Sequence, residues 1–299
     1  MNVNIAVVAS GPLIAGEIVT IIQSIISENI NIQTYLTSEI TGECPADLYV
    51  CAQTQMKSLL RVVARERIVL LDLMPNSKFF ISISRIPVKE KVYIFNNFLE
   101  YTAILSDYCK KLGMNELEFI PIAYREMPLE EISARLKNAR YIIGVDRFVG
   151  AGGLLSPSYR PYLRRDVTII PAVRTASVHS ACILIRRIAE KFHCHIADTI
   201  KKIKADLQSN PPLSAIDRQR LKSEADQLAI VSNHAMNIIQ KAVTKSVLNN
   251  ISADAAIFDA YDSSLDVDCL VNQPIDDSLA MIMEVNCTLG LIAEKLGSR

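Results

Sequence analysis

The stretch that decides the fold is "NIAVVASGPLIAGEIVTIIQSIISENINIQTYL", which runs from Asn4 to Leu36. Its opening residues form a short apolar run that a turn at Gly11-Pro12 ends, which is typical of a buried strand. The next part carries isoleucines at helical spacing, and "INIQTYL" then predicts a second strand. Because strand, helix and strand follow one another, the segment predicts a parallel β-sheet with helices on both faces.

The same alternation continues through the first two thirds of the chain. Further strands are predicted at 47–52, 67–73, 79–86, 91–97, 116–124, 140–145 and 167–172, and helices at 55–66, 98–113, 128–139 and 175–192. Gly113 suits a left-handed cap at the end of its helix. A proline-marked stretch near residues 87–90 separates two such series. We therefore predict an α/β fold of two Rossmann-like lobes, 1–90 and 91–192, with parallel sheets around a cleft.

Residues 193–299 follow a different pattern and predict a helical, coiled-coil-like C-terminal region. Apolar or small residues recur at steps of three and four at Leu221, Ala225, Leu228, Val231, Ala235, Ile238 and Ala242, and a second seam falls within 279–296. Such a stripe needs a partner. Two alternatives stay open: a homodimer through this helix, or packing within the chain, either on the lobes or as an antiparallel hairpin with the helix at 279–296.

Composition excludes several classes of function. The 32 basic and 32 acidic residues balance, so no clustered positive field for nucleic acid is predicted. No apolar run approaches the ~20 residues that span a bilayer, and the N-terminus lacks the basic start of a signal peptide. Seven cysteines without a C-x-x-C pair are typical of reduced thiols. We therefore expect a cytoplasmic protein.

Motifs for chemistry are weak. The turn "VGAGGL" (149–154) lacks the Lys-Ser/Thr of a phosphate-binding loop, and no G-x-G-x-x-G or G-x-S-x-G occurs. The run "HCH" (193–195) has the wrong spacing for a metal site on a helix. Cys51, at a strand end, is more typical of a core thiol than of a nucleophile. No cofactor, metal or catalytic residue is therefore predicted.

Polar residues gather where the predicted strands end, and parallel sheets bind ligands at that edge. Many donors and acceptors with few tuned acids favour binding over bond-making, although about half of them are expected only to cap helices. Arg85 and Arg174 match two oxygens of a carboxylate or phosphate. The same reasoning covers Tyr124, Glu126, Thr175 and Ser177. The predicted ligand-binding residues are Ser10, Gly11, Gln53, Thr54, Gln55, Arg85, Asn96, Asn97, Asp146, Arg147, Gly150 and Arg174.

Three stretches carry a resemblance to a known family: "VYIFNNFLEYTAILSDYCKKLG" (92–113), "ARYIIGVDRFVG" (139–150) and "LSPSYRPYLRRDVTIIPAVRTASVHSA" (155–181). The chain from about 4 to 192 resembles the N-terminal receptor domain of propionate-catabolism-type bacterial activators. It is also similar to Firmicute relatives that precede PAS or sigma-54-activating segments. The resemblance implies two lobes that enclose a small effector. The family's "SGEES"-like turn is replaced here by "PAVRTASVHSA", which implies a different ligand, and the sequence contains no sigma-54 ATPase core.

Three functions follow as hypotheses. The first is a cytoplasmic sensor in signal transduction or transcription regulation, whose lobes bind a small-molecule effector and move a C-terminal helix that contacts a downstream signalling protein or domain. The second is a racemase-like enzyme on the same scaffold, for which Cys51 and Asp146 are the best available residues. The third is an adaptor acting through its tail, where 246–294 holds nine acidic residues and no Lys or Arg.

Overall fold

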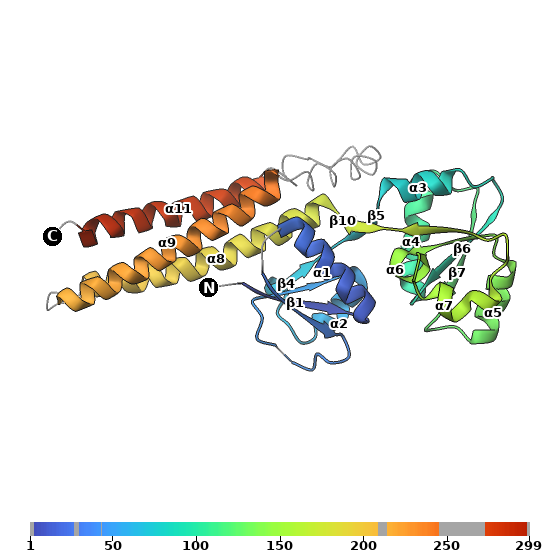
Figure 1. The fold of residues 1–299 in the computed structure, drawn as a ribbon, viewed down its shortest axis with the longest axis horizontal. Helices are drawn as coiled ribbons and strands as arrows, with labels where there is room; N and C mark the ends of the chain where they lie inside the picture. The colour runs from blue at the N-terminus through green and yellow to red at the C-terminus, as the bar shows by residue number, and fades with distance from the viewer. Residues whose placement is uncertain (1–2, 27–29, 43, 209–213, 245–272, 298–299) are drawn as a thin grey trace. The chain divides into compact units, whose positions relative to one another are not determined.

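The structure, a computed structural model, describes residues 3–26, 30–42, 44–208, 214–244 and 273–297 (Figure 1). It is an α/β protein with two four-stranded parallel sheets and a C-terminal helical region, as predicted. Contacts divide it into two units. Unit 1 comprises the chain up to Leu71 and three long C-terminal helices, and unit 2 runs from Asp72 to Ser177. Within the described ranges, we find no helix with the length and apolar character needed to cross a bilayer.

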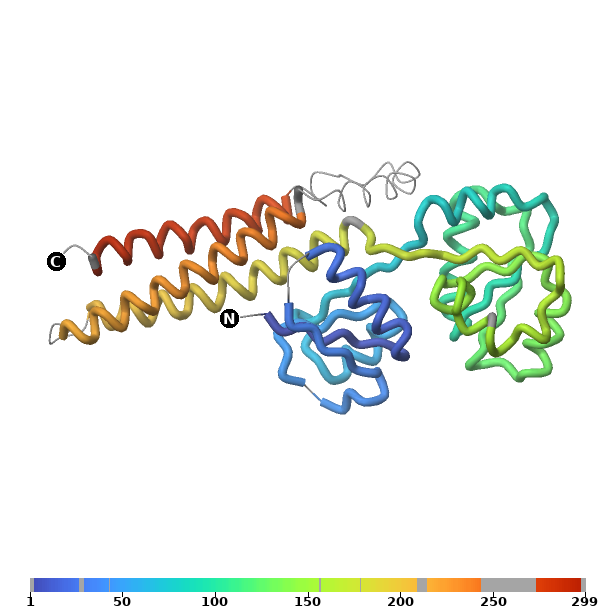
Figure 2. The backbone as a smooth tube through the Cα atoms, in the orientation of Figure 1, coloured from blue at the N-terminus to red at the C-terminus, as the bar shows by residue number. Residues whose placement is uncertain are grey.

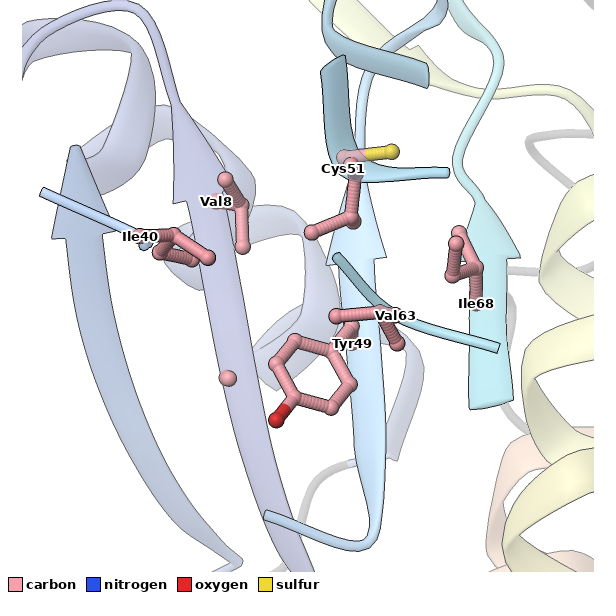
Figure 3. Close-up of a cluster of buried hydrophobic side chains, with 8 residues drawn as sticks. Val8, Ile40, Tyr49, Cys51, Val63 and Ile68 are labelled. Atoms are coloured by element: carbon pink, nitrogen blue, oxygen red, sulfur yellow. The ribbon is translucent and has the colours of Figure 1, made fainter. Parts of the chain in front are cut away.

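Unit 1 contains the first parallel sheet, with the strand order β2-β1-β3-β4. Its core includes Val8, Tyr49, Cys51 and Ile68, which lie together in Figure 3 with the side chains of two connecting segments. Helices α1 and α2 follow the first and third strands. The elements are β1 (Asn4–Ala9), α1 (Pro12–Ile26), β2 (Asn31–Leu36), β3 (Leu48–Cys51), α2 (Gln53–Leu59), η1 (Arg65–Arg67) and β4 (Ile68–Leu70).

Unit 2 repeats this topology, with the strand order β7-β6-β8-β9 and all neighbours parallel. The predicted cap of α4 is confirmed: Gly113 has φ +84° and its N–H donates to the carbonyl of Lys110. The elements are β6 (Lys91–Asn96), α4 (Leu99–Lys111), β7 (Glu118–Ala123), α5 (Leu129–Asn138), β8 (Tyr141–Val145), α6 (Asp146–Val149), α7 (Leu155–Tyr159), η2 (Arg160–Tyr162) and β9 (Thr168–Ala172).

In the part that the structure describes, the chain passes between the two units twice, after Leu71 and after Ser177. A small antiparallel sheet, which we call the connector, pairs the two segments of unit 2 next to these positions. It pairs β5 (Leu73–Pro75) with β10 (Arg174–Ala176), and the N–H of Ser177 donates to the carbonyl oxygen of Asp72. The sequence pattern had indicated one strand at 67–73 and a helix from residue 175. Strands of three residues contain too little of the two-residue alternation to be recognised in a sequence.

The predicted strand at 79–86 is wrong, because these residues belong to helix α3 (Ser77–Ser84). The Asn76 side chain accepts a hydrogen bond from the N–H of Phe79 and so begins the helix. Its buried residues, Phe79, Phe80 and Ile83, are spaced for one helical face. The segment is rich in β-branched and aromatic residues, which favour strands, so its sequence predicted a strand instead of this helix. The unit boundaries also differ from those expected. The chain leaves unit 1 at Leu71 instead of near residue 90, and Phe192, the expected end of the second lobe, lies within a helix.

The C-terminal region is a three-helix bundle of α8 (Val178–Leu207), α9 (Ala215–Thr244) and α11 (Gln273–Gly297), in which α9 runs antiparallel to the other two (Figures 1 and 2). Each helix packs against the other two, while α8 also contacts β4 and α9 contacts α1. The predicted seam of α9 is buried from Leu221 to Ala242 except for the half-buried Val231. The intramolecular alternative is therefore the one observed. The homodimer stays a prediction, and the seam of α9 no longer supports it because that seam is buried within the chain. Most of the acidic stretch at 246–294 lies outside the described residues.

Candidate functional site

Each parallel sheet has a topological switch point between its two central strands, where the chain connections leave in opposite directions. In unit 1 these strands are β1 and β3, and in unit 2 they are β6 and β8. Ten of the twelve predicted ligand-binding residues end or follow these central strands, and Arg85 and Arg174 do not. Ser10, Gly11 and the segment 53–55 form the unit 1 set, and Asn96, Asn97, Asp146, Arg147 and Gly150 form the unit 2 set. Our expectation that the two sets face each other across a cleft stays a prediction.

The unit 1 set makes hydrogen bonds mainly within its own loops. The buried amide of Gln55 accepts from the hydroxyl of Thr37 at 2.5 Å and donates to the hydroxyl of Thr54 at 3.0 Å. The carbonyl of Gly11 accepts from the N–H of Ala15 in the first turn of α1. Thr37, which sequence reasoning did not select, follows β2. The Thr37 hydroxyl also contacts the carbonyl of Ala9 at 3.1 Å, so Thr37 links the ends of β1, β2 and β3. Only Gln53 of this set is well exposed.

Cys51 lies at the end of β3 with its sulfur inside the unit 1 core (Figure 3). Burial raises the pKa of this thiol to about 12, and the charge of Arg65 offsets only part of that effect. The thiol is therefore protonated at neutral pH, whereas a nucleophile or base needs the thiolate. Asp146, the other residue of the racemase-like hypothesis, belongs to unit 2. These observations favour the core interpretation of Cys51.

The unit 2 set contains a buried donor. Asn96, at the end of β6, is 1% exposed, and its Oδ1 accepts from the N–H of Asn97 at 2.7 Å. Its Nδ2 has no hydrogen-bond partner among the described residues. Leaving a buried polar group unsatisfied costs about 1–3 kcal/mol, so each such group requires an explanation. A donor of this kind at a switch point is the expected signature of a ligand or a bound water.

The loops that follow β6 and β7 are joined around this donor. The carbonyl of Asn96 accepts from the N–H of Tyr124 at 2.9 Å, and the carbonyl of Asn97 accepts from the N–H of Arg125 at 3.2 Å. Glu126, in the same loop, accepts from the N–H of Leu99 at 2.6 Å, at the beginning of α4. The two loops and the N-terminus of α4 are therefore one hydrogen-bonded assembly.

The stretch around Asp146 shows why a glycine follows it. Asp146 begins α6, and a Cβ atom added at Gly150 would lie 2.2 Å from the Oδ1 atom of Asp146. The N–H of Gly150 also donates to the carbonyl of Asp146 at 2.7 Å. Gly150 thus permits a close approach, and the half-buried carboxylate lies against its own turn. Arg147 is exposed at this edge.

Four aromatic side chains form a cluster at the same edge of sheet β7-β6-β8-β9. Phe95 stacks on Tyr124 at 5.6 Å between ring centroids, and both rings have edge contacts, Phe95 with Tyr159 and Tyr124 with Phe148. Phe95 and Phe148 are buried, whereas the tyrosines are half-buried. Burial raises the pKa of Tyr124, which the neighbouring Arg125 partly offsets, and burial also raises the pKa of Tyr159. Sequence reasoning missed both Tyr159 and Arg125. Tyr159 was missed because it lies in a connection without a regular sequence pattern.

The two arginines predicted to clamp an anion lie in other places. Arg85 is exposed at the end of α3, not at a strand end as predicted. Arg174 lies in β10 and is buried, with its guanidinium carbon 5.0 Å from the centroid of the Tyr101 ring. No described contact joins the two arginines. Arg174 is therefore a residue of the connector, where its fork is held against an aromatic face.

The "HCH" run lies within α8. Among the described residues, no three His, Cys, Asp or Glu side chains are grouped so that they could hold a metal ion. No family model, curated protein or solved structure matched this chain in comparisons with known proteins. The resemblance to bacterial receptor domains therefore stays a prediction that depends on the quoted stretches alone.

Proposed function

We propose that this protein is a ligand sensor, in which a small metabolite binds the unit 2 set and the connector passes its effect to the C-terminal bundle. The observation that carries the proposal is the position of α4. This helix begins at Leu99, three residues after Asn96, and its two tyrosines contact both sides of the connector. One helix therefore touches both the candidate site and the path to the bundle.

The contacts of α4 with the connector are specific. Tyr101 lies under the guanidinium of Arg174 in β10, and the hydroxyl of Tyr108 is hydrogen-bonded to Asp72, the residue before β5. A shift of α4 would therefore move both connector strands together. Tyr101 and Tyr108 are seven residues apart, so they lie on one face of the helix.

The connector leads directly into the bundle. β10 ends at Ala176 and α8 begins at Val178, so one residue separates the strand from a thirty-residue helix (Figure 2). α8 in turn packs on α9 and α11, whose outer surfaces a downstream signalling protein or domain would contact. A ligand shifts such an equilibrium only by its differential affinity for the two states. The proposal therefore requires a ligand that favours one connector position.

The chemistry of the site favours binding over catalysis. Its groups are amides, an arginine and aromatic rings, and its one carboxylate of the predicted set, Asp146, lies against Gly150. Cys51, the candidate nucleophile, is a buried thiol. No observation favours the adaptor hypothesis over the sensor.

Thermal-shift screening of a metabolite library tests the binding step. A ligand at about 100 times its dissociation constant should stabilise the fold by roughly 2.7 kcal/mol. The transmission step is tested by spin labels on the exposed Cys194 of α8 and on a Lys137→Cys variant in α5, with Cys44, Cys269 and Cys287 replaced by serine. The ligand should change the distribution of distances between the labels. A ligand that stabilises the protein and leaves this distribution unchanged would contradict the proposal.

A further inference from the structure

We propose that the ligand of the unit 2 set is a small carboxylic acid with a flat, unsaturated or aromatic body. This inference depends on the proposed function, because it names the class of molecule that the same site takes. Three observations carry it: the buried donor of Asn96, the groups that favour an anion around the first turn of α4, and the half-buried aromatic faces at the same edge.

The donor of Asn96 requires an acceptor. Its Oδ1 is already occupied by the N–H of Asn97, so the orientation of the amide is fixed and Nδ2 is left to donate. The side chain is 1% exposed, so the acceptor must come close to the end of β6. An oxygen atom of a bound ligand satisfies this donor at the edge where open parallel sheets bind their ligands.

The surroundings favour a negatively charged oxygen. The N-cap residue of α4, Phe98, makes no side-chain capping hydrogen bond. The first N–H of the helix, that of Leu99, donates instead to the exposed carboxylate of Glu126, which lies in another loop. The dipole of a helix favours anions at its N-terminus. The guanidinium of Arg125 lies 5.8 Å from the centroid of the Phe98 ring. A ligand carboxylate would therefore find a positive field there, and Glu126 is the group it would displace.

The aromatic cluster selects the body of the ligand. The chain has no tryptophan, ten tyrosines and eight phenylalanines, yet four of these rings meet at the carboxyl edge of β6, β7 and β8. Tyr124 and Tyr159 are half-buried, so each residue keeps some contact with solvent at this edge. Aromatic rings favour offset stacking or edge contact with other flat groups. A bare phosphate makes no use of such faces.

Binding of four probes to the full chain tests this class by calorimetry and thermal shift. Benzoate supplies a carboxylate on a flat ring, cyclohexanecarboxylate a body of similar size that is not flat, propionate a short body, and inorganic phosphate a charge without a body. We expect benzoate to bind at least tenfold more tightly than the other three. Binding of phosphate, propionate or cyclohexanecarboxylate as tightly as benzoate overturns the inference, and so does the absence of benzoate binding.

Two variants locate the binding. Asn96→Asp keeps the acceptor for the N–H of Asn97 and removes the donor, so benzoate should bind at least tenfold more weakly. Asn138→Asp makes the same change on an exposed side chain at the end of α5 and should leave affinity unchanged. Tyr159→Leu removes a ring face and should weaken benzoate several-fold. Tyr141→Leu, at the opposite edge of the sheet, is its control. Benzoate affinity that is unchanged in both Asn96→Asp and Tyr159→Leu overturns the inference.

The outcomes separate this inference from the proposed function. If another metabolite stabilises the protein and moves the α8 label while benzoate does not bind, the sensor proposal stands and the ligand class is wrong. If benzoate binds through Asn96 and Tyr159 without moving the label, the ligand class stands and the sensor proposal is wrong.

Discussion

The guanidinium carbon of Arg174 lies 5.0 Å from the centroid of the Tyr101 ring, which places a buried cation of the connector on the face of helix α4. Two helical turns further along α4, the Tyr108 hydroxyl is hydrogen-bonded to Asp72, the residue before β5, the other strand of the connector. The connector has only three residues in each strand, so its ladder alone is weak. Contacts with α4 therefore contribute much of what fixes its position.

Replacement of Arg174 tests this contribution. Arg174→Ala should lower the free energy of unfolding by about 2 kcal/mol, because a desolvated cation–π contact and the packing of the arginine stem are both lost. Arg174→Lys should recover part of the loss, since the charge remains without the planar group. Denaturant unfolding measures both. Replacement of the exposed Arg165 by alanine is the control and should leave the unfolding midpoint unchanged. An unchanged midpoint in Arg174→Ala would contradict a structural role for Arg174.

Tyr108 gives the connector a dependence on alkaline pH. Burial raises the pKa of this hydroxyl well above its usual value of about 10, and the carboxylate of Asp72 raises it further. A raised pKa means that the folded state holds the proton more tightly. The corresponding stability is complete below pH ~10 and is lost as the pH rises toward the folded-state pKa.

Tyr108→Phe should therefore weaken the fold at pH 7 by about 1–2 kcal/mol, because Asp72 loses a hydrogen-bond donor. Its stability should also fall less steeply than that of the parent protein above pH 10. Urea unfolding from pH 7 to 11 measures both effects. Parallel pH profiles for the two proteins would show that Tyr108 does not titrate as inferred.

Thiol reactivity should separate the cysteines by burial. Burial raises the pKa of Cys51 and of Cys109 to about 12 and that of Cys182 to about 11, whereas Cys194 and Cys287 are exposed. In the native protein at pH 8, iodoacetamide should label Cys194 and Cys287 and leave the three buried thiols unmodified until the protein unfolds. Site-resolved mass spectrometry measures this. Labelling of Cys51 as fast as Cys194 would restore the case for a reactive thiol at the end of β3.

The sequence predicted elements that are long and periodic, and it failed where elements are short. The two parallel sheets and the long helices follow from apolar runs and helical spacing, and the cap at Gly113 follows from the conformational freedom of glycine. The connector strands are too short to show a period. Helix α3 was mistaken for a strand because "FFISIS" is rich in residues that favour strands.

The candidate site shows a similar division. The rule that ligands bind at carboxyl ends of strands selected Asn96 and Asp146, since strand ends are visible in a sequence. It also selected Arg85, because the wrongly predicted strand at 79–86 placed that arginine at a strand end. Tyr159 was missed because it comes from α7 and reaches Phe95 only in the folded chain. The free Nδ2 of Asn96 depends on the paths of neighbouring loops, which no local pattern indicates.

Gly150 should not tolerate a side chain. In Gly150→Ala the new Cβ atom would lie 2.2 Å from Oδ1 and 2.7 Å from the carbonyl oxygen of Asp146, so the turn after β8 must shift. Overpacking of this kind costs about 1–3 kcal/mol. Gly290, in the interior of α11, has no atom of another described element within 4 Å of such a Cβ, so Gly290→Ala should stabilise the protein by about 0.4–1 kcal/mol. Thermal unfolding of the two variants should shift in opposite directions, and a Gly150→Ala variant as stable as the parent protein would contradict the packing described for Asp146.

Ser232 offers a test of the bundle interior. Its side chain on α9 is fully buried, and its hydroxyl has no hydrogen-bond partner among the described residues. Ser232→Ala removes an unsatisfied group and favours the helix, so it should raise the free energy of unfolding by about 0.5–1.5 kcal/mol. Ser278, equally buried on α11, donates to the carbonyl of Pro274 at 2.6 Å, so Ser278→Ala should give no such gain. Chemical unfolding of both variants measures the difference. A clear loss of stability in Ser232→Ala would mean that the hydroxyl binds a buried water, because only a satisfied hydroxyl is costly to remove.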